Sequence, residues 1–174
     1  MKFAPALLIL SLTTFSAYTA EVTDSYLPHI SNIAELTDLN RQADAWATCS
    51  VIYDFYSEIV SSNETTATTE LLKQQSNGAI MAILMSQLIG LEESASEEQF
   101  TATYKYGQHL METLPSQKEL QIKSELEMLS VQKKPVAPVT DRILNTFKVC
   151  QSSLSLQQAY IDLFRELAKS GMIQ

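Results

Sequence analysis

Histidine and cysteine are scarce in this chain of 174 residues, and the shortage excludes several kinds of site. Two histidines, His29 and His109, and two cysteines without a Cys-x-x-Cys pair are too few for a structural zinc site. The Cys-x-x-Cys-His motif of covalent haem is absent. A di-iron bundle needs two Glu-x-x-His motifs, and the chain offers only the reversed spacing from His109 to Glu112. We therefore predict no metal site and no cofactor.

Soft metal ligands and activated nucleophiles are also lacking. Met81, Met85, His109 and Met111 have the side-chain types of a copper site, but His109 and Met111 are two apart and face different sides of a helix. Methionine more often fills irregular gaps in a core. A haem held by His109 and a methionine lacks a paired axial-ligand pattern. No Gly-x-Ser-x-Gly turn exposes a serine. The sequence predicts a protein that is not an enzyme.

Alternating strand patterns and long apolar runs are missing as well. The apolar stretch near the start, Phe3 to Leu12, is far shorter than the roughly 20 residues of a membrane span. It follows Lys2 and precedes the small residue Ala20, an arrangement typical of a secretory signal peptide over residues 1–20. We expect cleavage, a mature chain without a transmembrane anchor, and a periplasmic or secreted location.

Basic residues are outnumbered, with 12 Lys and Arg against 20 Asp and Glu, and the formal net charge is −8. An acidic, exported chain is a poor ligand for nucleic acid or for anionic lipid surfaces. Two cysteines in an oxidising compartment most simply form one disulfide, Cys49–Cys150. Two buried free thiols are the alternative, because a buried cysteine can act as a small hydrophobe.

The stretch from Asp44 to Val60 has the spacing of a helix with a broad buried face. Its first apolar row has helical spacing and consists of Ala45, Cys49, Ile52, Tyr56 and Ile59. A second row beside it contains Trp46, Tyr53 and Val60, so we predict that the only tryptophan is buried. A helix with two adjacent apolar rows contacts two neighbours, as a bundle member does.

The rest of the chain reads as an N-terminal arm, residues 21–37, and a helical domain, residues 38–174. Capping residues and prolines divide that domain into an all-α antiparallel four-helix bundle with one interhelical disulfide. We expect the third helix to be broken at Pro115, because Ser116 and Glu119 form a new capping box there. The expected helices are Asp38 to about Val60, Thr66 to Ile89 with Gly90 as a left-handed stop, Ser96 to about Val131 with the break, and Thr140 to about Ala168.

Gly78 and Gly107 fall inside the second and third predicted helices, at nearly the same height if these form a hairpin. A glycine inside a helix costs about 1 kcal/mol relative to alanine, so something should compensate. Close approach of two backbones is one explanation. A ligand pocket or a hinge near Gly78, Met81 and Gly107 is the other.

Charge is unevenly distributed along the chain. From Glu21 to Glu70 there are nine acids and one base, whereas from Pro115 onward there are eight bases and six acids. Asp44, Asp54 and Glu58 lie off the Cys49 row, and we predict that they bind a partner protein, for which a basic surface would be complementary. Alternatively, these acids offset cations of the last predicted helix, such as Arg142, Lys148 or Arg165.

From these features we expect a small exported helical binding module that acts on another protein, for example an inhibitor or a toxin-immunity protein. The alternative is a bundle that binds a small apolar ligand or haem between its helices.

Overall fold

The computed structural model describes residues 26–27, 29–61 and 66–173, and every regular element in these ranges is helical. The elements are a 3-10 turn, η1 (Ile33–Glu35), and five helices: α1 (Leu39–Ser61), α2 (Thr66–Leu88), α3 (Glu97–Val131), α4 (Ala137–Ser152) and α5 (Leu154–Lys169). The all-α class is confirmed, but the four-helix bundle is not, because five helices are present in the described ranges. The predicted signal peptide, residues 1–20, lies outside the described residues.

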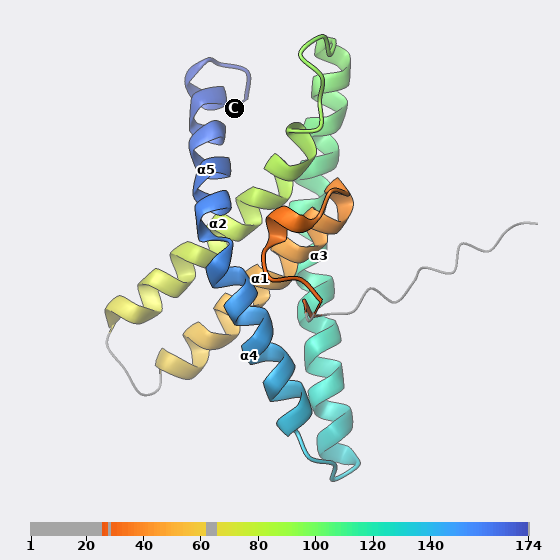
Figure 1. Cartoon of the computed structure of the whole chain (residues 1–174), viewed down its shortest axis with the longest axis vertical. Coiled ribbons are helices and arrows are strands. Elements are labelled where there is room, and N and C mark those ends of the chain that lie inside the picture. Colours follow the sequence, from red (N-terminus) through yellow and green to blue (C-terminus); the bar gives the residue numbers. More distant parts are fainter. Residues whose placement is uncertain (1–25, 28, 62–65, 174) are drawn as a thin grey trace, which may run out of the picture.

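The helices form an antiparallel pair and two longer columns (Figure 1). α1 and α2 lie side by side and cross the molecule diagonally. α3 runs along the longest axis, and α4 followed by α5 makes up a second column that begins beside the end of α3 and leans away from it. The columns flank the α1–α2 pair, which therefore contains most of the buried core.

α1 begins and packs as its sequence predicts. The carboxylate of Asp38 accepts a hydrogen bond from the backbone N–H of Arg41 at 2.9 Å, which satisfies a free donor of the first turn. Trp46 is fully buried, as predicted, and its ring meets Tyr160 of α5 edge to face at 6.2 Å between centroids. The first apolar row is buried as far as Ile52, whereas Ile59 near the end of the helix is 47% exposed.

The centre of α2, Ala79 to Met85, is apolar and mostly buried: Ala79, Ala82 and Ile83 have 0% exposure, whereas Ile80 and Met81 are half-buried. Gly90 follows this helix but does not adopt the left-handed conformation that we expected. The missing side chain of Gly90 instead makes room for Leu39 at the start of α1, because a Cβ atom at Gly90 would lie 2.2 Å from Leu39 Cδ1. The left-handed glycine is instead Gly171, after α5, with φ +76°.

α3 is one continuous helix through Pro115, so the predicted break there is wrong. Its start is confirmed, since Ser96 and Gln99 form a reciprocal capping box. A proline inside a helix removes one hydrogen bond and costs about 3 kcal/mol. Both flanking segments are held against α1 and α2, by Gly107 against Leu84 on one side and by the buried Lys118 on the other. These contacts keep the helix intact, and Ser116 and Glu119 lie inside it without acting as a cap.

The break occurs instead in the last predicted helix, at Ser153, between α4 and α5. Serine side chains compete for backbone partners, and Ser153 Oγ donates to the carbonyl of Val149 at 2.8 Å. The N-terminal arm occupies this junction. Ile33 N–H donates to Ser153 Oγ at 3.0 Å, and Asn32 Nδ2 donates to the Ser152 carbonyl at 2.7 Å. The arm therefore satisfies polar groups that the break leaves free, across about 120 residues of sequence.

The start of α4 also differs from the expected one. The helix begins at Ala137, with Pro138 in its first turn, where a proline's fixed φ suits the helix. Thr140, at which we expected this helix to begin, lies inside α4, and its hydroxyl donates to the Val136 carbonyl at 3.3 Å.

Cys49 of α1 and Cys150 of α4 form a disulfide, with 5.6 Å between their Cα atoms. Both residues are fully buried, and both belong to the main apolar core together with Trp46 and Tyr53. The covalent link thus joins the α1–α2 pair to the second column just before the break at Ser153.

We expect the Cys49→Ala/Cys150→Ala variant to lose about 4–5 kcal/mol of unfolding free energy, because the disulfide closes a loop of 101 residues. Urea unfolding of both proteins, with and without reductant, measures the loss. Reductant should destabilise the natural protein to a similar extent and leave the variant unchanged. Equal urea midpoints for oxidised and reduced natural protein would contradict the expectation.

Candidate functional site

A cleft of about 290 Å³ opens where the second half of α1 faces α3, with one side chain contributed by α2. We call it the α1–α3 cleft. It is lined by Val51, Asp54, Phe55, Ser57, Glu58, Lys73, Pro115, Ser116, Glu119, Ile122 and Lys123. Two of the three predicted partner-binding acids, Asp54 and Glu58, are among these residues.

The helical repeat explains why these side chains meet. Asp54 and Glu58 are four apart on α1, so they lie one turn from each other on the same face. Pro115, Glu119 and Ile122 have the corresponding spacing on α3, and they share a face only because α3 continues through the proline. The cleft is therefore a direct consequence of the unbroken third helix.

The interior of the cleft is apolar, whereas its rim is charged. Val51 and Ile122 are buried and belong to one apolar cluster, against which Phe55 packs. Around them stand three acids and two bases, and among these five described residues the one ion pair is the exposed one between Glu119 and Lys123 at 2.5 Å. An exposed pair of this kind stabilises a protein by at most about 1 kcal/mol.

Asp54 is the carboxyl group whose environment is most altered in this cleft. Partial desolvation raises its pKa, and the nearby charges of Glu119 and Glu58 raise the pKa further. A hydrogen bond with the buried Ser76 and the charge of Lys73 act in the opposite direction. The negative charge of Asp54 is therefore incompletely compensated by the protein itself, and a cation placed in the cleft would stabilise it.

Asp44, the third predicted partner-binding acid, lies elsewhere and has a partner inside the protein. Its carboxylate is 2.8 Å from the ammonium of Lys118 of α3, whose side chain is only 3% exposed. Burying a lysine ammonium without a counter-charge costs several kcal/mol, so this ion pair serves the packing of α3 on α1.

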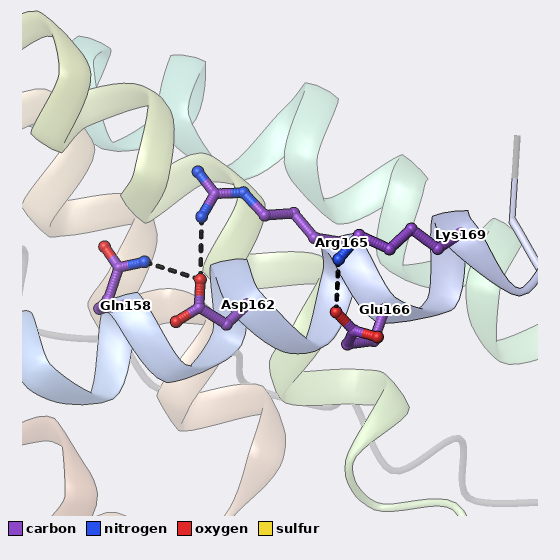
Figure 2. A network of polar contacts seen from close by, with 5 residues as sticks. All are labelled: Gln158, Asp162, Arg165, Glu166 and Lys169. Atoms are coloured by element: carbon purple, nitrogen blue, oxygen red, sulfur yellow. Dashed lines mark hydrogen bonds and ion pairs between the residues drawn. The ribbon is translucent and has the colours of Figure 1, made fainter.

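The cations that we named on the last predicted helix do not contact these acids. Arg142 of α4 pairs with Glu125 and lies over the ring of Tyr26, 4.7 Å from its centroid. Arg165 of α5 pairs with Asp162 on its own helix at 2.9 Å, in the surface network of α5 shown in Figure 2. Lys148 is exposed and forms no ion pair with the acids of the described part of the chain.

The proposed ligand pocket is filled by side chains where its two glycines lie. A Cβ atom at Gly78 would lie 2.1 Å from Gln157 Nε2 of α5, and one at Gly107 would lie 2.5 Å from Leu84 Cδ1 of α2. The glycines therefore face different helices rather than each other, and each permits close approach. Met81 is half-buried and packs against the main core. None of the three lines the α1–α3 cleft.

Metal-binding and membrane-spanning features do not occur among the described residues. Residues 26–173, with their gaps, contain no group of three or more His, Cys, Asp or Glu side chains that could hold a metal ion. Of the helices described, none has the length and hydropathy needed to cross a membrane. His109 is exposed on α3, whereas Met85 is fully buried in α2.

Comparisons with protein-family models, with curated proteins and with solved structures found no match to this chain. The geometry of the molecule is therefore the basis for assigning a function.

Sequence reasoning missed the α3 side of the cleft, namely Pro115, Glu119, Ile122 and Lys123. One signal was present: Lys118, Ile122, Glu125 and Leu129 continue a helical spacing from Leu114 across the proline. The capping-box pattern at Ser116 outweighed this spacing in the prediction, because local patterns contain no information about packing on α1.

We expect Asp44→Asn to cost about 3–5 kcal/mol of unfolding free energy, because it leaves the buried Lys118 ammonium without its counter-charge. Combining Asp44→Asn with Lys118→Met should restore most of that loss. The control is Glu119→Gln. Glu119 is exposed and directly follows Lys118 in α3, so its substitution should change the unfolding free energy by less than about 0.5 kcal/mol. Chemical denaturation measures all three, and an unchanged Asp44→Asn protein would show that the pair contributes nothing.

Asp54→Asn, in contrast to Asp44→Asn, is expected to increase the unfolding free energy. Because the folded-state pKa of Asp54 is raised, the natural protein becomes more stable as pH falls through that pKa, and its penalty is fully present at neutral pH. The variant should be more stable at pH 7 by about 0.3 kcal/mol for each like-charge neighbour that it no longer faces. The difference should shrink towards about pH 4, near the unfolded-state pKa. Denaturation at several pH values tests this, with the exposed Asp141→Asn as control, and a pH-independent difference would contradict it.

Proposed function

We propose that this chain is an exported helical module without enzymatic activity, and that its α1–α3 cleft binds a basic segment of another protein. The supporting observation is the meeting of Asp54 and Glu58 with Glu119 around an apolar interior. Such a site suits a lysine or arginine whose alkyl stem or apolar neighbour enters the cleft while its charge meets the carboxylates.

The size of the cleft supports side chains of a protein partner over a free small molecule. Its volume of about 290 Å³ is at the lower limit of small-molecule sites, which range from about 300 to 1,000 Å³. One or two side chains of a docked segment fill such a space. Formal net charge adds a long-range attraction for a basic partner, because the chain has 20 acids and 12 bases.

The proposed function also includes export from the cytoplasm. A disulfide is typical of an oxidising compartment, and the signal-peptide pattern of residues 1–20 favours export to the periplasm or the exterior. An inhibitor or a toxin-immunity protein would need only such a small, cross-linked scaffold with one charged cleft. The alternative, an apolar ligand or haem held between the helices, has less support at Gly78 and Gly107 themselves, because the side chains of Gln157 and Leu84 occupy the space beside them.

Selection of a randomised peptide library against the oxidised protein tests the proposal. We expect enriched peptides to combine a lysine or arginine with an apolar residue. Their affinity should fall about three- to tenfold in the Asp54→Asn/Glu58→Gln variant and should depend less on salt, because two rim charges are lost.

The matched control is Glu70→Gln/Glu93→Gln, which removes two exposed acids outside the cleft. This variant should bind the selected peptides as the natural protein does. Peptides that bind the cleft variant equally well, or that contain no basic residue, would refute the proposed cleft function.

A further inference from the structure

The second half of α3 carries large apolar side chains that are more than half exposed, which we call the α3 stripe. Leu120 is 68% exposed, Met128 54% and Val131 76%, and Val136 follows after the helix at 48%. These are large side chains, and four of them gather within seventeen residues of sequence. Single exposed apolar residues are ordinary, but a gathered set marks a surface that binds something.

The stripe lies on the reverse side of α3 from the core. Lys118, Ile122 and Leu129 face α1 and α4, where they are buried or half-buried. Leu120 and Val131 are eleven residues apart, which is about three turns, so they share a face on the opposite side of the helix. An amphipathic helix with one core face should be polar there. The side of α3 opposite its core face therefore carries the exposed apolar side chains Leu120, Met128 and Val131, with the polar Ser124 and Glu127 between them.

The charged residues beside the stripe indicate which molecule would bind to it. Lys123 and Glu127 are both exposed and flank the midpoint between Leu120 and Val131. If a second α3 packs antiparallel with Leu120 opposite Val131, Lys123 of each helix lies opposite position 128 of the other, one residue from Glu127 and within reach of its carboxylate, in competition with its own Glu119. Parallel packing would bring like charges together, Lys123 to Lys123 and Glu127 to Glu127. The stripe is thus complementary to itself in one orientation only, as a two-fold interface requires.

We propose that this reverse face of α3 is a homodimer interface, in which two copies pack antiparallel with Leu120 of each against Val131 of the other. The buried core of the chain does not change, because the stripe is already outside it. The interface is independent of the α1–α3 cleft, although Lys123 lies beside both.

Sedimentation of the oxidised protein over a range of concentrations tests the interface. We expect a reversible monomer–dimer equilibrium, with a dissociation constant that rises about tenfold or more in Leu120→Glu, because an apolar contact is replaced by a charge. Leu71→Glu is the matched control, since Leu71 is also an exposed leucine, 54% exposed on α2. Circular dichroism and thermal unfolding should confirm that both variants stay folded.

A charge exchange tests the register. Lys123→Glu gives a chain that is acidic at both positions, and Glu127→Lys gives one that is basic at both. Each alone should dimerise more weakly than the natural protein, whereas an equimolar mixture should form heterodimers at least as readily. Pairing within one chain cannot produce this recovery, because the two changes are on different molecules.

A protein that remains monomeric at all concentrations would overturn the proposal and would leave the stripe to a different partner. A mixture that does not recover would overturn the antiparallel register, and equal weakening by Leu71→Glu would place the contact elsewhere. The peptide-binding experiment is unaffected by these outcomes, because it uses the Asp54 and Glu58 side of the cleft.

Discussion

The Cys49–Cys150 disulfide joins the two parts of the molecule that depend most on each other. On one side is α1, whose Trp46 and Tyr53 fill the centre of the core, and on the other is the α4–α5 column. The column breaks three residues after Cys150, where the arm binds the junction at Ser153. A broken helix on its own would leave backbone groups free and could move as two pieces. The disulfide fixes the end of the first piece on α1, and the arm fixes the start of the second.

Charge is used in two different ways on neighbouring turns of α1 and α3. The Asp44–Lys118 pair is enclosed, so its ammonium has no access to water or to another molecule. Asp54 and Glu58 lie beyond it, where the helices separate and a cleft remains open. The difference comes from the crossing of α3 over α1: near Asp44 the two helices are packed, and further along each diverges from the other. The enclosed Asp44–Lys118 pair holds the fold, whereas the charge of Asp54 at the open cleft is only partly compensated, by Ser76 and Lys73.

Local structure could be predicted from the sequence, whereas the position of the helix break could not. The caps at Asp38 and Ser96 and the burial of Trp46 follow from patterns within a few turns, and the cysteine pairing follows from the presence of only two cysteines. Pro115 and Ser153 depend on distant segments instead. α1 holds α3 together across the proline, and the arm stabilises a break in a serine-rich segment that contains no proline or glycine. The same holds for the candidate site. Its acids on α1 were predicted from local spacing, whereas its residues on α3 were not, because their position depends on the packing of α3 on α1.

The two proposed surfaces of α3 are connected by symmetry. Glu119 and Lys123, at the rim of the cleft, lie on the same flank of the Leu120–Val131 stripe. The two-fold axis of an antiparallel helix pair is perpendicular to the plane of both helices, so it keeps that flank on one side of the dimer. Both clefts then open towards the same side. A partner with two basic segments could occupy both at once, and the second contact would form at an effective concentration that can reach the millimolar range. Weak individual clefts with small volumes are sufficient for tight binding in such an arrangement.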